Sequence, residues 1–279
     1  MKATTAADIA GEARAGTAAA VEPMAPFDGF DASMVEGTCP VSAGAREVYA
    51  GIVRAVAGCL GVQVRGIEQI PQGRALLVAN HAFGWDVAFP MEAIARATGR
   101  SVWALGEHLW WKIPVMRRIA AAVGVVDGRR DVAARLLAAD QIVVVQPGGL
   151  REAVKPRELR YQLLWGKRYG FVEVAIRTGT PILPLACTGA DEFFDFVGDP
   201  YARGRRWLHA KGIPVPLPAR LLPIPHVAPL RYVVGEPISA EGVDPEDAHA
   251  VHRVRREVEG ALHELIENEL ARRAGIPYP

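Results

Sequence analysis

Hydrophobic positions along the chain follow two patterns that alternate. Short, nearly continuous apolar runs are typical of buried strands, and apolar residues spaced three or four positions apart are typical of helices. The predicted strands are 62–71 with its closing turn, 75–80, 101–105, 141–146, 181–189 and 229–238. The predicted helices are 41–61, one starting at about 86, 114–124, 131–140, 169–179 and 244–275. This alternation predicts a single α/β domain with a largely parallel, mixed sheet flanked by helices.

The apolar face can be identified most clearly on the first and last predicted helices. The C-terminal helix is long and amphipathic, with Asp244 as a suitable N-cap and Pro245 at the first helical position. Its expected buried stripe consists of Val251, Val254, Val258, Leu262 and Leu265. On the first helix, one face carries the apolar residues Val48, Ile52, Val56 and either Cys59 or Leu60.

Residues 1–40 differ in composition from the rest of the chain. They are rich in Ala, Gly, Thr and Pro, and Phe27 and Phe30 are their only aromatic residues. Because so little apolar surface cannot offset the entropy of ordering, we expect a flexible N-terminal arm. The globular domain is then expected over residues 41–279.

Composition and charge narrow the class of protein. Half the residues are hydrophobic and 23% are charged, a globular composition, and the net charge of +1 gives no reason to expect nucleic acid as a partner. Three cysteines without a CxxC pair indicate reduced thiols and no metal site. The N-terminus lacks the apolar core of a secretory signal, and no stretch reaches about 18 uncharged apolar residues. These features predict a cytoplasmic protein without a transmembrane helix.

Several common catalytic motifs are absent from the sequence. There is no GxxxxGK[ST], and no predicted strand is followed by GxGxxG. There is also no GxSxG elbow, and the chain has only four serines. Kinase, dehydrogenase and serine hydrolase functions are therefore disfavoured.

The segment after the predicted strand 75–80 is the clearest candidate for chemistry. His81 stands at the carboxyl end of that strand, and Asp86 follows five residues later. On a helix this spacing separates two side chains by about 140°, and on a strand it puts them on opposite faces. They can meet only if the chain folds back between them, which Gly84 permits. We therefore expect a His–Asp pair at the mouth of the sheet, where α/β folds bind ligands.

A histidine backed by a carboxylate has the chemistry of a general base. Because serines are scarce, the base would activate a substrate hydroxyl, a substrate amine or water. Two structural interpretations compete with this one. Asp86 could be the N-cap of the next helix, and His81 could be a hydrogen-bonding group at a strand end.

A second candidate segment follows the predicted strand 141–146. The pair Gly148 and Gly149, after Pro147, would let the backbone approach a ligand closely, and exposed N–H groups there could hold an anion. Arg151 adds donors suited to a phosphate or carboxylate. The structural alternative is a Pro-Gly turn with a solvated arginine.

Basic residues gather in two stretches of the chain. Between 112 and 168 there are twelve Lys or Arg against five Asp or Glu, and Trp110, Trp111 and Trp165 lie in or beside this stretch. Residues 202–225 contain four Arg, one Lys and one Trp, without an acidic residue. Cations beside Trp and Leu suit an anionic membrane surface, and a solvated charged face is the alternative.

Taken together and in this order, the motifs resemble the glycerol-phosphate and lysophospholipid acyltransferase superfamily over about residues 45–270. Asn80, His81 and Asp86 match its NHxxxxD motif. Further blocks are similar at 113–114 and 124–129 (IP and GVVDGR), 146–153 (QPGGLREA in the place of FPEGTRS), 181–194 (PILPLACTGADEFF) and 230–238 (LRYVVGEPI). Gly148 replaces the family's Glu, a departure closer to branches that resemble phytyl ester synthases and diacylglycerol acyltransferases.

The resemblance implies a glycerol-phosphate acyltransferase-like fold and an O-acyltransferase that uses acyl-CoA or acyl carrier protein as donor, without a cofactor. His81 and Asp86 would be catalytic. The residues implied to bind substrate are Asn80, Gly84, Pro147, Gly148, Gly149 and Arg151. The acceptor would be a glycerol phosphate or lysophospholipid, as in phospholipid biosynthesis, or a neutral lipid alcohol. A lipid acceptor in turn implies peripheral contact with the inner face of the membrane.

Two other functions fit the same residues. A His–Asp pair that activates water would make a thioesterase, which releases fatty acid without an added alcohol. A lipid-binding protein on the same fold would bind tightly without turnover.

Overall fold

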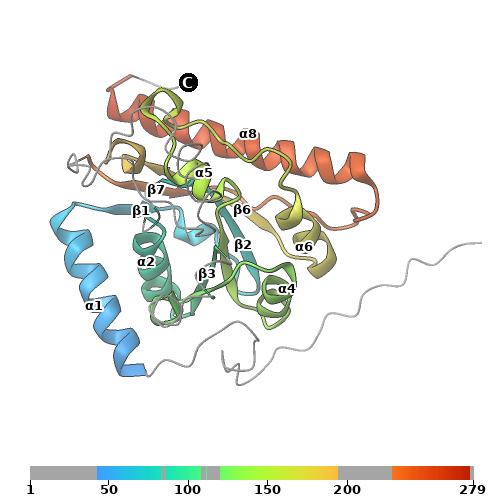
Figure 1. Ribbon diagram of the computed structural model, residues 1–279, viewed down its shortest axis with the longest axis horizontal. Helices are drawn as coiled ribbons and strands as arrows, with labels where there is room; N and C mark the ends of the chain where they lie inside the picture. Colours follow the sequence, from blue (N-terminus) through green and yellow to red (C-terminus); the bar gives the residue numbers. More distant parts are fainter. Residues whose placement is uncertain are drawn as a thin grey trace, which may run out of the picture.

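A seven-stranded sheet with helices on both faces forms the centre of the computed structural model (Figure 1), which describes residues 43–82, 84, 86–107, 111, 120–193 and 228–276. The strands are β1 Gln63–Arg65, β2 Ala75–Ala79, β3 Val102–Gly106, β4 Val125–Asp127, β5 Ile142–Val145, β6 Ile182–Thr188 and β7 Arg231–Val234. Their order is β1-β7-β6-β2-β5-β3-β4, and every neighbouring pair is parallel except β6 and β7. The predicted α/β fold with a largely parallel, mixed sheet is confirmed.

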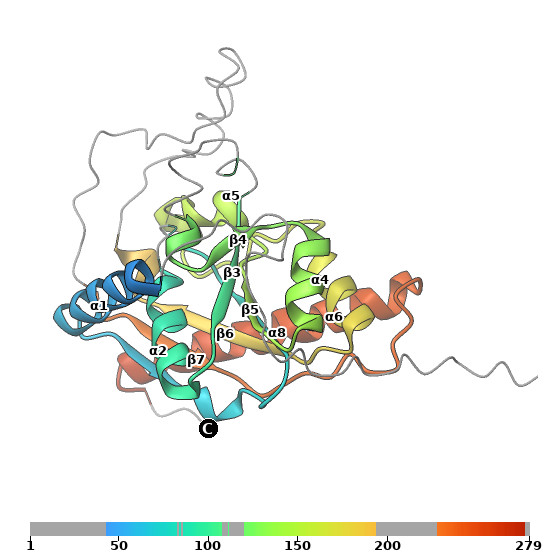
Figure 2. The same cartoon turned by 90° about the horizontal axis from the view of Figure 1, so that it is seen from below.

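Helices cover the two faces of the sheet in separate layers (Figure 2). They are α1 Ala43–Cys59, α2 Ala88–Thr98, α4 Arg130–Ala138, α5 Gly149–Ala153, α6 Gly170–Thr178 and α8 Ala248–Arg273. Helices α1 and α2 pack on one face, and α4, α6 and α8 pack on the other. Alternate residues of β2 serve the two layers, since Leu76 and Val78 face the second group while Leu77 and Ala79 face the first.

Strand β2 is the most enclosed part of the sheet, with all five of its residues buried. It lies between β5 and β6 and is parallel to both. The carboxyl ends of these three strands therefore open at the same edge. The segments that follow them, beginning at Asn80, Gln146 and Gly189, are brought close together there. Ligands in open α/β sheets bind at this edge, so this is the place for a site.

The amino-terminal ends of the central strands, opposite this edge, are held by arginine side chains. Arg100 donates to three main-chain oxygens, those of Pro71, Gly73 and Asp140, at 2.6 to 2.8 Å. Arg74 donates to Asp140 Oδ1 at 3.0 Å and to the Thr178 carbonyl at 2.9 Å. These bonds join the turns that precede β2, β3, β5 and β6, so the amino ends of the central strands are tied to one another.

Most predicted elements occur close to their expected bounds, and Gly179 ends α6 with a φ of 59° as expected. Strand β4 was not predicted, because its two valines stand between Gly124 and Asp127 and are too few to form a hydrophobic pattern of their own. The predicted helix 114–124 falls mostly outside the described residues, as does the N-terminal arm over 1–40.

Two details of the helix faces differ from expectation. Helix α8 begins three residues later than predicted, because the side chain of Asp247, not Asp244, accepts hydrogen bonds from His249 N and Ala250 N. Its buried stripe includes Val251, Val254, Val258 and Leu262 as predicted, but continues through Ile266, while Leu265 is only half-buried. On α1, the apolar face predicted for Val48, Ile52 and Val56 does not pack on the described part of the chain. These three side chains are exposed there, and Val53 is buried instead.

Candidate active site

His81 and Asp86 meet just beyond the end of β2, as their spacing predicts. Nδ1 of His81 lies 3.2 Å from Oδ1 of Asp86, and neither of these buried atoms has another hydrogen-bond partner. The chain folds back between them at Gly84, whose φ of 93° lies in the region that favours glycine. The His81 side chain is 12% exposed and that of Asp86 only 1%. The imidazole thus faces buried charge on one side and reaches solvent on the other.

The carboxylate of Asp86 is ionised and held in one orientation. Its Oδ2 accepts hydrogen bonds from Ala82 N and Gln146 Nε2, both at 3.1 Å. Burial raises the pKa of Asp86, but the His81 imidazole and the Ala82 N–H together outweigh burial, so the pKa of this carboxyl is lowered. Helix α2 starts after Val87 without a side-chain cap, so the N-cap interpretation of Asp86 is wrong.

Asn80 joins two strands at the same edge. Its side-chain amide donates to the Cys187 carbonyl at 2.9 Å and accepts from Cys187 N at 2.7 Å. These two bonds fix the end of β2 against β6, and Asn80 is only 1% exposed. The contacts of Asn80 are therefore structural ones that set the position from which His81 departs.

Cys187 lies behind the pair but is not a suitable nucleophile. It is buried, and burial together with the nearby Asp86 carboxylate raises the pKa of its thiol well above the usual value. A thiol must ionise to attack, so this group is inert at neutral pH. Within the described residues, the nucleophile for any reaction at His81 must come from a substrate or from water.

The segment 147–151 stands beside the pair, at the end of β5. Arg168 Nη1 donates to the carbonyls of Pro147 and Gly148, and Gly149 N donates to the Gln146 carbonyl at 2.9 Å. The N–H of Gly149 is therefore used within a turn and cannot also hold an anion. Arg151 is exposed on the short helix α5, and no described contact joins it to His81 or Asp86.

Two residues that the sequence analysis missed contact His81 directly. Glu152 Oε1 accepts from His81 N at 2.7 Å, and Lys155 Nζ donates to the His81 carbonyl at 3.2 Å. Glu152 is fully buried, and the Lys155 side chain is 2% exposed. The only available signal in the sequence was a Glu and a Lys among apolar residues after a buried strand.

The structure describes only part of the two basic stretches that were predicted to contact a membrane. Trp165 is 1% exposed, packs edge-on against Phe171 with ring centroids 5.5 Å apart, and lies under Arg255. It belongs to the core and cannot contact a membrane. Trp110, residues 112–119 and residues 202–225 lie outside the described residues. Among the described helices, none is both long and apolar enough to cross a membrane.

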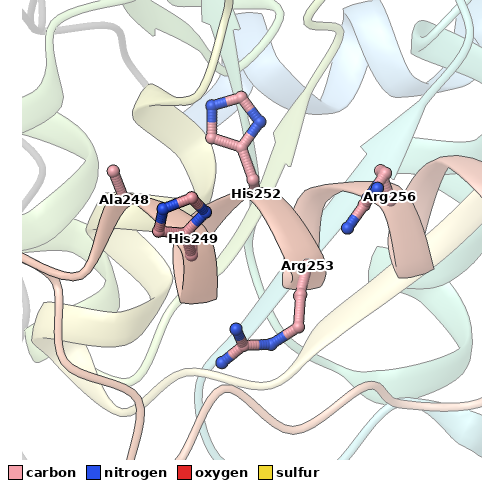
Figure 3. Close-up of a pocket in the computed structure, with 5 residues that line it drawn as sticks. All are labelled: Ala248, His249, His252, Arg253 and Arg256. Carbon is pink, nitrogen blue, oxygen red and sulfur yellow. The ribbon is translucent and has the colours of Figure 1, made fainter.

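A hollow of about 470 Å³ lies elsewhere, on the first half of α8 (Figure 3). Its lining residues all come from that helix and are Ala248, His249, His252, Arg253 and Arg256. It shares no residue with the His81 site. An open, cationic surface of this kind holds no fixed base beside a buried carboxylate, so we place the chemistry at His81.

Comparison with known proteins agrees with this site. A family model described as Acyltransferase matches residues 61–188, which run from just before β1 to the end of β6 and include His81, Asp86 and 147–151. The match covers less than half of the chain, and over this range the chain is similar to the acyltransferase family. Together with the relatives described next, this match confirms the resemblance to the glycerol-phosphate and lysophospholipid acyltransferase superfamily that the motifs indicate.

Individual relatives match different shares of the chain. A mouse protein named "DGAT1/2-independent enzyme synthesizing storage lipids" is 32% identical over 152 residues, 54% of this chain and 45% of that protein. An uncharacterized protein of Mycobacterium tuberculosis is 30% identical over 232 residues, 77% of this chain and 63% of that protein. The chain thus spans about half the length of the mouse relative.

One solved structure is also similar. The 1-acyl-sn-glycerophosphate acyltransferase PlsC from Thermotoga maritima has 17% sequence identity and a TM-score of 0.48, with 79% of each chain covered.

Proposed function

We propose that this protein is an O-acyltransferase that moves a fatty acyl group from a thioester to the hydroxyl of a lipid. The observation that carries the proposal is the contact between His81 Nδ1 and the buried Asp86 Oδ1 at the open edge of the sheet. The buried carboxylate holds the proton on Nδ1, which leaves Nε2 unprotonated as the base. The match of residues 61–188 to the acyltransferase family model supports the reaction class.

The proposed reaction proceeds in one displacement. Nε2 of His81 removes the proton of the acceptor hydroxyl while its oxygen attacks the thioester carbonyl. The tetrahedral intermediate then collapses, the C–S bond breaks, and the thiolate leaves and takes up the proton from His81. Asp86 stabilises the imidazolium that forms between these events. Within the described residues no suitable nucleophile lies beside His81, which supports direct attack without an acyl-enzyme.

For the acceptor we propose a neutral lipid alcohol. Gly148 carries no side chain where the family pattern has a Glu, and Arg151 makes no described contact with the His81 pair. Lys155, the cation that contacts His81, is buried and paired with Asp191, so within the described residues no exposed cation is fixed beside the base to hold a phosphate. The name of the mouse relative, an enzyme synthesizing storage lipids, points the same way. For the donor we propose acyl-CoA, with acyl carrier protein as the second candidate.

Thiol release from a long-chain acyl-CoA tests the function and the acceptor together. We expect release, with ester product detected by mass spectrometry, when diacylglycerol or a long-chain alcohol is added, and release slowed by about 10²- to 10⁴-fold with His81→Asn. Release that requires glycerol phosphate or a lysophospholipid would overturn the neutral acceptor. Release of free fatty acid without any acceptor would establish a thioesterase. If no arm releases thiol, acyl carrier protein replaces CoA, and failure there as well would overturn the acyltransferase.

A lipid acceptor requires contact with a membrane, and we propose that this contact is peripheral, on the cytoplasmic face. The cationic stretch between 112 and 168 supports electrostatic attraction to anionic lipid. Sedimentation with anionic vesicles should therefore recover the protein at low salt and lose it as salt rises, because screening shortens the reach of exposed charges. Absence from such vesicles at every ionic strength would contradict this mode of contact.

A further inference from the structure

The main chain of His81 is held by two charged side chains rather than by the sheet. Ladder pairing of β2 ends at Ala79, so His81 lies beyond the last strand-to-strand hydrogen bonds. Its N–H donates to Glu152 Oε1 at 2.7 Å, and its carbonyl accepts from Lys155 Nζ at 3.2 Å. Both peptide groups that flank the catalytic residue are therefore fixed from the same segment.

The two charged groups are fixed in their turn. The second oxygen of Glu152 accepts from Leu164 N at 2.8 Å. Lys155 pairs with Asp191 Oδ2 at 2.8 Å, and the same oxygen accepts from Tyr161 N at 2.6 Å. Both oxygens of Glu152 accept from a main-chain N–H, a pattern that suits an ionised carboxylate. A rigid set of contacts thus runs from the segment 161–164 and from Asp191 to His81.

Buried charged contacts of this kind contribute little net stability to a fold, because removing the charges from water costs free energy. Burial raises the pKa of Glu152, with Lys155 and the two N–H donors opposing it, and burial likewise raises the pKa of Asp191. Charged groups buried in pairs are often no better for stability than apolar residues of the same size. Their presence against the catalytic residue therefore points to positioning. We propose that Glu152, with Lys155, is a positioning residue that sets the His81 imidazole against Asp86 and towards the acceptor.

Gly148 gives independent support for this role. A Cβ built at Gly148 would lie 1.9 Å from Glu152 Oε2 and 2.4 Å from Glu152 Cβ. Its φ of −63° is ordinary for any residue, so backbone strain does not explain the glycine. Any side chain at 148 is excluded by the carboxylate that reaches His81 from 152. Gly148 and Glu152 therefore depend on each other, because the Glu152 side chain occupies the space that a side chain at position 148 would need.

Glu152→Ala and Glu152→Gln test the proposal, which rests on the proposed function for its kinetic readout only. Displacing a base by about 1 Å costs on the order of 10²-fold in rate. We expect kcat to fall about 100-fold in Glu152→Ala with KM for acyl-CoA nearly unchanged. The loss should be smaller in Glu152→Gln, which keeps one accepting oxygen and most of the volume. Ring resonances of His81 in histidine-labelled protein, assigned through His81→Asn, should shift or broaden in both variants.

Glu269→Gln is the matched control, because Glu269 is also a buried carboxylate in an ion pair, with Arg65 on β1. It should leave kcat and the His81 resonances as in the wild type. Unchanged His81 resonances and a kcat within threefold of wild type in folded Glu152→Gln would overturn the proposal. If the wild type transfers no acyl group but the Glu152 variants still move the His81 resonances, the proposed function fails and the positioning of His81 stands.

Discussion

Replacement of His81 by Asn is expected to lower acyl transfer by about 10²- to 10⁴-fold, the usual contribution of a general base. Asn is preferred to Ala because its amide can still donate to Asp86 Oδ1, so the buried carboxylate is not left without a partner. The measurement is the rate of acceptor-dependent thiol release, with the midpoint of thermal unfolding measured on the same preparation.

The structure also gives the reason why this variant should fold. The main chain of residue 81 keeps its bonds to Glu152 and Lys155 whatever its side chain is. A folded His81→Asn protein whose rate stays within tenfold of the wild type would show that His81 is not the base. A matched change of His263, which is on α8 and makes no described contact with His81 or Asp86, should leave the rate unaltered.

Asp86→Asn is expected to have an effect of about 10³- to 10⁴-fold on the same rate, since an Asp-to-Asn change behind a catalytic histidine fixes the wrong tautomer. The neighbours of Asp86 determine the orientation of the new amide. The position of Oδ2 receives donors from Ala82 N and Gln146 Nε2, so the amide oxygen must stay there. The amide NH2 then faces His81 Nδ1, and the proton is driven to Nε2, where the base is needed.

The same variant has a pH-dependent effect on stability. Because the folded-state pKa of Asp86 is lowered, its ionised form stabilises the fold at pH values above the ordinary carboxyl pKa of about 3.9. That contribution is lost as pH falls through the folded-state value. Urea unfolding should therefore show the largest difference between wild type and Asp86→Asn at neutral pH, and a smaller one on acidification. A difference that is the same at every pH would contradict the ionised, stabilising state of Asp86.

The His81–Asp86 pair could be predicted because its geometry follows from local rules. A buried strand has to end somewhere, His81 stands at that end, and five residues with a glycine among them leave one way for the side chains to meet. The structure departs from these rules only in detail, with α2 beginning at Ala88 and Asp86 turned inward instead of capping it.

The contacts of Glu152 and Lys155 could not be predicted in the same way. They join side chains to a main chain 71 and 74 positions away, and no periodic pattern encodes a bond of that kind. Helix α8 illustrates a smaller failure of the same sort. Asp244 and Asp247 are equally good caps by residue type, but Asp247 accepts from His249 N and Ala250 N, whereas Asp244 accepts from Glu246 N in the preceding loop.

The two edges of the sheet differ in how their loops are held. At the amino edge, Arg74 and Arg100 tie the turns to one another through backbone carbonyls and Asp140. At the carboxyl edge, the loops after β2 and β5 are held together by the contacts of Glu152 and Lys155 with His81. Loops carry function while the scaffold carries stability. Substrate preference can therefore diverge through changes at one edge while the opposite edge preserves the fold, which makes this architecture readily adaptable to new acceptors.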